Sequence, residues 1–371
     1  METILRAHKI RLCPNNKQAT YFSKACGVAR FAYNWALARS KELYWQDNSY
    51  KFNEAAIRRE LNAIKGAQFP WMLEVTKCAP QLAIKDDLNS AYKNFLAKRS
   101  EFPKFRKKGI HDSFSLSNDQ FKVNDNHVHI PKLGEVRLAE QLRFSGKIIA
   151  ATISRTADKW FIAIQVEIQK PEPTHTGKSQ ATGVDFGIKA LATLSDGTAI
   201  QSSKASRKYE NRLKRLNQEL SRRKGAKKGE RQSANFKKTK LGIARLYARM
   251  ANLRADETHK LTTMLTQNYG LIGIEDLNVR GMLKNHNLAR YIADAALSEC
   301  RRQIGYKSEV SGSRVVVADR WFASSKTCSN CGAVKETLSL SERTYHCDIC
   351  GFICDRDHNA ALNLKYYALR A

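Results

Sequence analysis

Four cysteines between residues 328 and 350 have the spacing of a metal site. The pattern is Cys328-x2-Cys331-x15-Cys347-x2-Cys350, two tight pairs of the kind that close a tetrahedron around zinc. Gly332 and Gly351 directly follow the pairs and permit turns that point backbone amides at the sulfurs. Four thiolates leave zinc no open position, so the site is expected to hold a small ribbon together rather than to catalyse. The alternatives are a redox dithiol or chance, and Cys354 is interpreted as a bystander.

Three acidic residues far apart in the sequence suggest a second metal site. Asp185 lies in "TGVDFGIKAL", Glu275 ends "LIGIE", and Asp357 stands in "DRDHNAALN" where a helix is expected to begin. A carboxylate among apolar neighbours costs several kcal/mol unless it is paired or bound to a metal. Hard oxygen ligands of this kind can hold two magnesium ions about 4 Å apart, one activating water and one stabilising a leaving oxygen.

Each of these acids also has a simpler interpretation, as a helix cap or as a partner in a surface ion pair. Asp276, Asp319 and Asp355 are equally acidic and close by in the sequence. Spacing alone does not separate them from the three candidates.

The charge of the chain points to a polyanion as its partner. The 371 residues include 64 Lys and Arg against 35 Asp and Glu, for a formal net charge of +29. Between residues 204 and 240 there are fifteen Lys or Arg and three Glu, too few acids for helical ion pairing to explain the run. Contact with nucleic-acid phosphates is the favoured interpretation, and a solvated face or an acidic membrane surface is the alternative. The candidate nucleic-acid-binding residues are Lys104, Arg106, Lys107, Lys108, Arg222, Arg223, Lys227 and Lys228.

The sequence shows no sign of a membrane or secretory segment. It has no apolar run of about 18 residues, and "METILRAHKIRL" is not a signal peptide. We expect a cytoplasmic, nucleoid-associated protein.

The elements that must position these residues fall into several blocks. "AHKIRLCP" predicts a strand, and apolar periodicity predicts mostly helix from residue 16 to 114, with Val28, Phe31 and Trp35 on one face. "HVHIPKLGEVRL", "KIIAATISRT" and "KWFIAIQVEI" predict strands, which a small antiparallel barrel that includes the first strand would explain. Residues 170–180 are typical of a linker.

Beyond this linker the pattern predicts a mixed α/β domain. Strands are expected in "ATGVDFG", "KALATLSDG", "TAIQS", "LIGIEDLNV" and "SRVVVADR", a long basic helical region over residues 203–267, and a helix over residues 288–306. An antiparallel opening meander in an α/β domain is typical of the ribonuclease H-like pattern, although periodicity alone supports only the α/β class.

With these residues in view, the sequence resembles the TnpB family, transposon-encoded relatives of the type V CRISPR effectors, over nearly its whole length. The front segments are "HKIRLCPNNKQ", "CGVARFAYNWAL" and "FPKFRKK". The central ones are "TGVDFGIKALATLSDG", "NLRADETHKL" and "IGIEDLNVRGMLKNHNLAR". The last are "RWFASSKTCSNCG" and "CDRDHNAALN".

The resemblance implies an RNA-guided DNA endonuclease of an insertion sequence. Its guide RNA would derive from the transposon end, its target would be double-stranded DNA beside a short transposon-adjacent motif, and one protein would bind one RNA. The expected fold is multidomain α/β with a β-barrel: a RuvC nuclease core of ribonuclease H-like fold, an inserted zinc ribbon, a wedge-type barrel and a helical recognition domain. The cofactors would be structural Zn²⁺ and catalytic Mg²⁺.

The resemblance also assigns boundaries and the catalytic residues. It implies a first barrel strand at 1–15, a recognition domain at 16–114, the rest of the barrel at 115–175, the RuvC domain at 176–326 and 352–371, and the ribbon at 327–351. The RuvC triad would be Asp185, Glu275 and Asp357, because the family's final acid precedes x-Asn-Ala-Ala. This selects Asp357 over Asp355 by resemblance, not by physical argument.

Two other functions are compatible with the same surface. A nuclease-silent, RNA-guided repressor would bind without cutting, which the presence of all three acids argues against. A transposase that joins strands itself would need a His-x-His combined with a nucleophilic Tyr in a matching context. The sequence contains a His-x-His at residues 127–129 and thirteen Tyr, but it does not present that combination.

Overall fold

The computed structural model describes residues 2–173, 180–224, 232–339 and 341–371. The chain divides into two compact units, Met1–Lys170 (unit 1) and Pro171–Ala371 (unit 2), and each is described by itself. The division falls at the first residue of the predicted linker, of which residues 174–179 lie outside the described residues. No helix in the described ranges combines the length and the apolar character needed to cross a bilayer.

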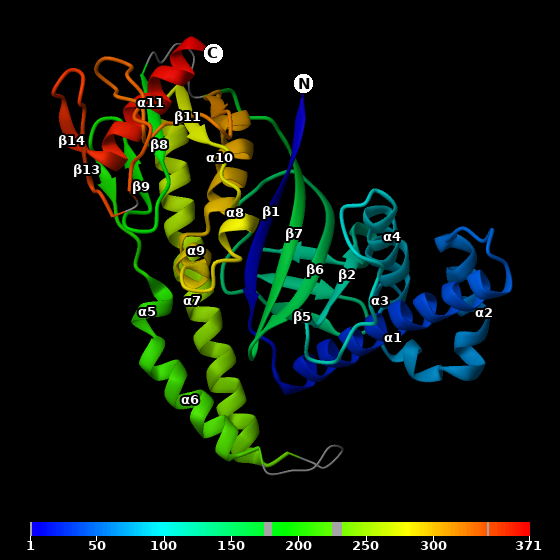
Figure 1. The fold of residues 1–371 in the computed structure, drawn as a ribbon. Helices are drawn as coiled ribbons and strands as arrows, with labels where there is room; N and C mark the ends of the chain where they lie inside the picture. The colour runs from blue at the N-terminus through cyan, green and yellow to red at the C-terminus, as the bar shows by residue number, and fades with distance from the viewer. Residues whose placement is uncertain (1, 174–179, 225–231, 340) are drawn as a thin grey trace. The chain divides into compact units, whose positions relative to one another are not determined.

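Unit 1 is built on a four-stranded antiparallel sheet (Figure 1). Its order is β1 (Thr3–Leu12), β7 (Lys159–Gln169), β6 (Lys147–Thr156) and β2 (Ser113–Ser117). The first strand pairs with β7 along its whole length, from Thr3 opposite Gln169 to Leu12 opposite Trp160. The expectation that the first strand joins strands more than a hundred residues later is confirmed.

A second, three-stranded sheet contains β3 (Lys122–Asn124), β4 (His127–Ile130) and β5 (Gly134–Arg137). It touches the first sheet where the amide of Cys13 donates to Arg137 O at 2.9 Å. Within the described residues β2 and β3 do not pair, because a 3-10 turn at Asn118–Gln120 joins them instead. The closed barrel expected from the sequence is therefore corrected to two open, antiparallel sheets joined at one corner.

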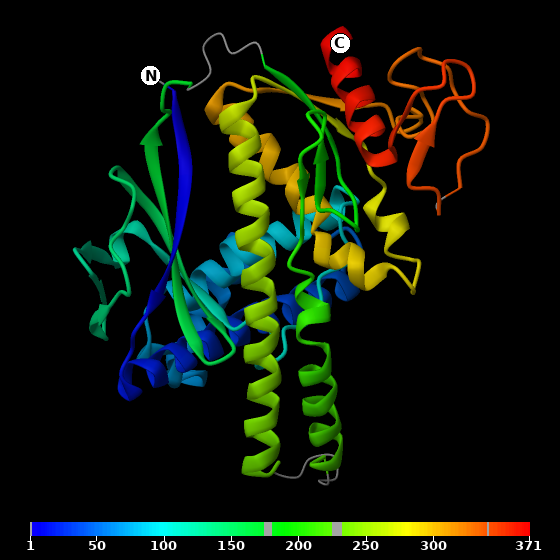
Figure 2. The ribbon, with the colours of Figure 1, turned by 90° about the vertical axis from the view of Figure 1, so that its left-hand side faces the viewer.

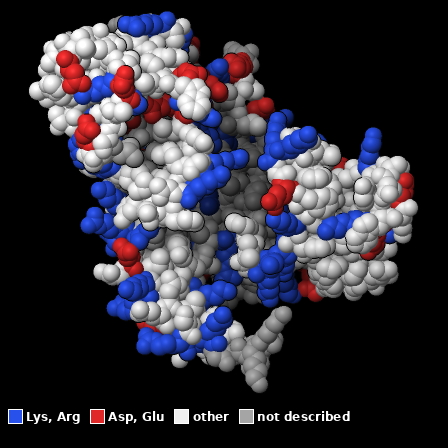
Figure 3. Space-filling view, viewed as in Figure 1, with Lys and Arg blue, Asp and Glu red and all other residues white. Residues whose placement is uncertain are grey.

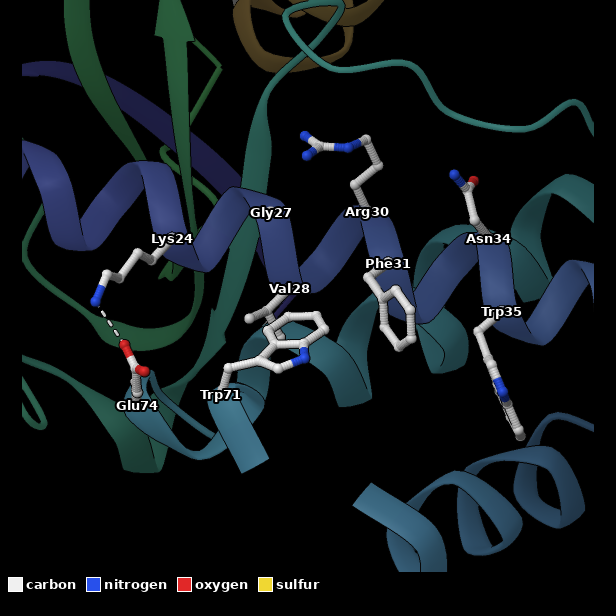
Figure 4. Close-up of a pocket in the computed structure, with 9 residues that line it drawn as sticks. All are labelled: Lys24, Gly27, Val28, Arg30, Phe31, Asn34, Trp35, Trp71 and Glu74. Carbon is white, nitrogen blue, oxygen red and sulfur yellow. Dashed lines mark hydrogen bonds and ion pairs between the residues drawn. The ribbon is translucent and has the colours of Figure 1, made fainter. Parts of the chain in front are cut away.

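The helices of unit 1 are α1 (Asn16–Gln46), α2 (Glu54–Gln68), α3 (Cys78–Leu82) and α4 (Asn89–Leu96), with a π-helical turn at Ala83–Leu88. A capping box starts α1, because the Asn15 side chain accepts from the Gln18 amide and the Gln18 side chain accepts from the Asn15 amide. The fully buried face of α1 is rich in alanine. Phe31 and Trp35 are only half-buried, and Phe31 lies beside Trp71 at 5.0 Å between ring centroids (Figure 4).

Unit 2 contains a five-stranded mixed sheet. Its order is β10 (Ala199–Ile200), β9 (Ala192–Leu194), β8 (Ala181–Asp185), β11 (Leu271–Glu275) and β12 (Arg314–Ala318). The strands β8, β9 and β10 are antiparallel, whereas β8, β11 and β12 run parallel. This confirms the predicted α/β class with an antiparallel opening meander.

Helices cover both faces of this sheet. On one face Val184, Ile272 and Ile274 share an apolar core with residues of α7 (Ala234–Asn268) and α10 (Leu297–Ser311). On the other face α11 (Arg356–Arg370) contacts β8, β11 and β12. The remaining helices are α5 (Ala205–Lys208), α6 (Glu210–Arg222), α8 (Val279–Met282) and α9 (Ala289–Ala295).

Two predicted helices are interrupted in the structure. The helix expected over residues 288–306 is divided into α9 and α10 at Ala296, whose φ of 49° is left-handed and cannot continue a right-handed helix. The basic region is divided into α5, α6 and α7, and α6 runs beside the first half of α7 as a hairpin (Figure 2). Residues 225–231, between the two helices of the hairpin, lie outside the described residues.

Candidate functional site

The four cysteines of the predicted zinc site lie together. Their Sγ atoms are all within 4.8 Å of one another, with Cys328 3.7 Å from Cys350 and Cys331 3.6 Å from Cys347. Sulfurs around a tetrahedral zinc with Zn–S bonds of about 2.3 Å are roughly 3.8 Å apart. The cluster therefore fits a structural zinc site.

Short backbone turns position the sulfurs. The Gly332 amide donates to Cys328 O and the Gly351 amide donates to Cys347 O, each at 2.9 Å. Both glycines have positive φ, 80° and 71°, which other residues adopt only at a cost. The hairpin of β13 (Thr344–His346) and β14 (Ile353–Asp355) adds the buried Tyr345 to the ribbon's small core.

Hydrogen bonds from neighbouring groups reach one sulfur of the cluster. Asn330 Nδ2 donates to Cys350 Sγ at 3.6 Å. This hydrogen bond and one from the Phe352 amide lower the pKa of the Cys350 thiol to about 6. The thiolate is the metal-binding form of cysteine. The fifth thiol, Cys354, is not a member of the cluster and burial raises its pKa.

Asp185 and Glu275 emerge side by side from the sheet of unit 2. They end β8 and β11, which are adjacent and parallel, with Gly183 opposite Gly273. Because side chains alternate along a strand, residues 183 and 185 face one side, as do residues 273 and 275. That side is the one covered by α11.

The two glycines let α11 lie close to the sheet. A Cβ atom on Gly183 would overlap Ala361 O and Lys365 N, and one on Gly273 would overlap Leu364 O. Only glycine can occupy positions that a helix backbone approaches this closely. The contact brings the first turn of α11, which carries Asp357, to the ends of β8 and β11.

Asp185 is influenced by the charges of both other candidate acids. Burial, and then the negative charges of Glu275 and Asp357, raise the pKa of Asp185 to about 8. Three crowded carboxylates of this kind are stabilised by a bound cation. They converge less tightly than the thiols: among the described residues, only the four cysteines bring their ligand atoms within 4.8 Å of one another.

The neighbouring acids have other roles in the structure. Asp276 pairs with Arg301 and, at 2.7 Å, with Arg320, and these hydrogen bonds lower its pKa. Asp355 caps α11, because its Oδ1 accepts from the amides of residues 357 and 358. Asp319 accepts from the amide of residue 321 at 2.8 Å. These are the cap and ion-pair roles that spacing alone could not separate from metal binding.

Two asparagines that the sequence analysis did not single out tie the ribbon to α11. Asn359 Nδ2 donates to Thr327 O at 2.7 Å, and Asn363 Nδ2 donates to Ser324 O at 2.8 Å and to Thr327 O at 2.7 Å. Both asparagines are buried, 0% and 5% exposed. Their spacing of four residues within the apolar run "NAALN" is the signal that could have identified them, since it places two amides on one buried face of a helix.

The basic residues near position 104 differ in their surroundings. Lys107 and Lys108 are exposed, and Lys104 is exposed and paired with Glu101. Arg106 is instead part of the fold: its guanidinium pairs with Asp87 at 2.8 Å and lies 4.0 Å over the ring of Tyr33. Arg106 therefore has partners within unit 1, and its role in nucleic-acid binding stays a prediction.

The second predicted basic group lies at the end of the α6–α7 hairpin. Arg222 is exposed, and Arg223 contacts Thr239 and pairs with Glu219 at 3.4 Å. Lys227 and Lys228 lie outside the described residues. Lys and Arg side chains gather along the outward edge of α5 and α6 (Figure 3), so the hairpin presents a basic surface to solvent.

Comparisons with known proteins place the chain in a family. Three family models match it: one described as "Probable transposase" over residues 163–286, a "Cas12f1-like, TNB domain" over 298–364, and a "Helix-turn-helix domain" over 1–49. In the structure, the last of these regions consists of one strand and one long helix, β1 and α1.

Similar proteins cover nearly the whole chain. A protein from Streptomyces pristinaespiralis is 36% identical over 380 residues, covering 100% of this chain and 91% of the relative. InsQ from Escherichia coli strain K12 is 32% identical over 376 residues, covering 97% and 91%. Both are named as candidate RNA-guided DNA endonucleases.

A solved structure supports the same assignment at the level of the fold. The structure of a Cas12f1–sgRNA–target DNA complex matches with a TM-score of 0.59 and 13% identity, covering 98% of this chain and 99% of that one. Two relatives above 30% identity cover nearly the whole chain, and the "Probable transposase" model matches residues 163–286. The chain therefore belongs to the TnpB family of insertion-sequence proteins.

Proposed function

We propose that this protein is an RNA-guided DNA endonuclease that cleaves target DNA at the Asp185, Glu275 and Asp357 carboxylates. The observation that carries the proposal is the meeting of these acids at the ends of two parallel strands and the start of α11, in a family whose relatives carry that name. The order β10-β9-β8-β11-β12, with an antiparallel opening and parallel remainder, supports a RuvC core of ribonuclease H-like fold.

The donor set is suited to magnesium. Magnesium prefers carboxylate oxygens and keeps several waters, and two such ions, when bound, supply an activated water and charge stabilisation at the leaving oxygen. Asp185, Glu275 and Asp357 would hold the ions, and Asp185 experiences the charge of both other acids. Arg356, 3.6 Å from Asp357, would limit the excess negative charge.

The rest of the chain would bind and orient the nucleic acids. Exposed Lys and Arg, including Arg222 on the hairpin, would hold phosphates without reading sequence. Sequence would be read by pairing between DNA and a guide RNA derived from the transposon end, beside a transposon-adjacent motif. We propose one protein per RNA, with zinc in the cysteine cluster fixing the ribbon next to α11.

A cleavage assay tests the proposal. The RNA that co-purifies with the protein is sequenced, and plasmids carrying the matching target beside a randomised flanking segment are incubated with the complex and Mg²⁺. We expect linearised plasmid from one subset of flanks, and none with Asp185→Ala, Glu275→Ala or Asp357→Ala, although these variants still bind target. Removing ions that supply several kcal/mol of charge stabilisation corresponds to a loss of about 10³-fold or more.

Asp276→Ala is the matched control, because it removes an adjacent acid that is paired with arginines, and it should retain most of the cleavage. Specific binding without cleavage by the wild type would identify a nuclease-silent repressor. Joined strands in place of ends would identify a transposase. Cleavage by Asp185→Ala at the wild-type rate would remove the assignment of the site.

A further inference from the structure

A single serine, in the segment of residues 319–327 that leads from β12 to the ribbon (the approach segment), contacts the candidate metal ligand Glu275. Ser324 is 3% exposed and lies between β12 and the first cysteine of the ribbon. Its hydroxyl donates to Glu275 Oε1, and its carbonyl accepts from Asn363 Nδ2 at 2.8 Å. The serine is therefore held from α11 at its backbone while its side chain holds the carboxylate.

The same approach segment is fixed to α11 on both sides of a cysteine of the cluster. Asn359 Oδ1 accepts from the Ser329 amide at 3.0 Å, and Asn359 Nδ2 donates to Thr327 O at 2.7 Å. Thr327 and Ser329 are the residues directly before and after Cys328. One set of hydrogen bonds thus runs from Glu275 through Ser324, Asn363 and Asn359 to the two residues that flank Cys328. Asp357 lies on the same turn of α11 as Asn359.

We propose that Ser324, Asn359 and Asn363 form a clamp through which the metal-loaded ribbon positions Glu275 and Asp357, so that metal in the cysteine cluster raises the affinity of the carboxylates for divalent cations. The inference rests on the proposed function, in which these carboxylates bind Mg²⁺. All three are positioning residues, since none of them would touch the ion or the substrate.

The hydrogen bond to Glu275 has the geometry that positioning requires. A carboxylate has two oxygens, and the Ser324 hydroxyl occupies Oε1, which leaves the other oxygen for a cation. Groups that orient a metal ligand from behind contribute about 10- to 100-fold to metal affinity. Without the hydroxyl, Glu275 would gain side-chain freedom that binding a cation must then remove.

The ribbon can transmit its metal state because it has little core of its own. Its buried cluster contains only Cys328, Tyr345 and Cys347 among fully buried described residues. Segments this small fold when metal binds and unfold when it leaves. Loss of zinc would free Cys328, and with it the backbone groups of Thr327 and Ser329 that Asn359 holds.

A merely structural role would have a different signature. If Ser324 only satisfied a buried carboxylate, removing its hydroxyl would lower the melting temperature and leave cation affinity unchanged. Ser313 provides the matched control: it is 8% exposed, lies in the same unit, and its hydroxyl donates to the carbonyls of Thr266 and Tyr269 at 2.9 and 2.8 Å. Its hydrogen bonds contact no acid.

The experiment measures cation binding directly, by titrating the full-length, zinc-loaded protein with Mn²⁺ and following free Mn²⁺ by electron paramagnetic resonance. We expect Ser324→Ala to raise the Kd about tenfold and Ser313→Ala to leave it unchanged. Removing zinc from the wild type with a chelator, followed by its separation, should raise the Kd similarly. In Ser324→Ala, zinc removal should add much less, because the coupling runs through the missing hydroxyl.

The outcomes separate this inference from the proposed function. If Asp185→Ala and the wild type bind Mn²⁺ equally, the carboxylates are not a cation site and the proposed function fails. If Asp185→Ala loses the site while Ser324→Ala and zinc removal leave the Kd unchanged, the clamp is overturned and the function stands. Asn363→Ala is the second variant, with zinc content and melting temperature measured beside the Kd, and an unchanged Kd in this variant also counts against the clamp.

Discussion

The cysteine cluster and the carboxylate cluster both gather negative ligands at one point, but over very different lengths of chain. The thiols come from residues 328–350 and are held by local turns at two glycines of positive φ. The carboxylates come from residues 185, 275 and 357 and are held by two strands and a helix. The difference teaches that the thiol cluster is formed by a short stretch of chain, whereas the carboxylate cluster depends on the packing of α11 against the sheet.

The largest effect is expected from removing a ligand of the cysteine cluster. Cys328→Ser or Cys347→Ser should lower the zinc content from about one ion per chain to none, because structural zinc contributes on the order of 10 kcal/mol to such modules. Elemental mass spectrometry measures the stoichiometry. Cys354→Ser is the control, since this thiol is outside the cluster. Unchanged zinc in both ligand variants would show that the ion is held elsewhere.

The carboxylate cluster should be disrupted by substitutions that leave its three acids in place but move α11. Gly183→Ala or Gly273→Ala places a methyl group against the backbone of α11, so the helix and Asp357 must move. We expect a loss of about 1–3 kcal/mol in the free energy of unfolding, measured by urea titration, together with a loss of cleavage. Gly305→Ala, in α10 with nothing near its Cβ position, should instead be neutral or stabilising by up to about 1 kcal/mol. Equal stability of Gly183→Ala and wild type would refute the close approach.

How much the sequence predicts follows the same division. The cysteine site was predictable because its ligands and turns are neighbours in the chain. The carboxylates were identifiable as candidates, but the choice of Asp357 over Asp355 came from a family resemblance, and the capping role of Asp355 required coordinates.

The structure differs most from the local sequence pattern where tertiary contacts intervene. Arg106 looks like a free base in a basic stretch, yet it pairs with Asp87, a partner that charge counting does not reveal. The barrel stays open because the chain between β2 and β3 turns rather than pairs, and short strands carry no signal of their partners. The Ser324 contact with Glu275 joins residues that no periodicity connects.

A change at the hairpin tests whether affinity is separate from both clusters. Replacing Arg222, Arg223, Lys227 and Lys228 by Gln should flatten the log–log salt dependence of RNA or target binding by nearly one unit per lost phosphate contact. Target preference should not change, because pairing carries specificity. Binding is measured from about 50 to 200 mM salt. The control is Arg302→Gln, which removes an exposed arginine paired with Glu299 at 2.7 Å. Equal salt-dependence slopes for the wild type, the quadruple variant and the control would mean that the basic residues of the hairpin are only solvated.

The smallest expected effect concerns the helices behind the sheet, away from both clusters. Burial between α7 and α10 lowers the pKa of Lys307 to about 8 from its usual 10.5. Above pH 8 the unfolded chain therefore holds more protons at this residue than the folded one, so its contribution to stability should rise with pH up to about 10.5. In Lys307→Met this part of the rise should disappear from urea midpoints measured across that range. A parallel pH profile in the variant would contradict the lowered pKa of Lys307.

The position of α11 near the end of the sequence has a consequence for folding during synthesis. Asp185 and Glu275 are synthesised before Asp357, and the 82 residues from Glu275 to Asp357 take a ribosome about 4–16 s to add at ordinary rates of 5–20 residues per second. Until then no helix covers the face of β8 and β11 at Gly183 and Gly273, and the carboxylate cluster has only two of its three members. A nascent chain can therefore complete unit 1 before the three carboxylates are together. Any nuclease activity would begin only after α11 has packed against β8 and β11.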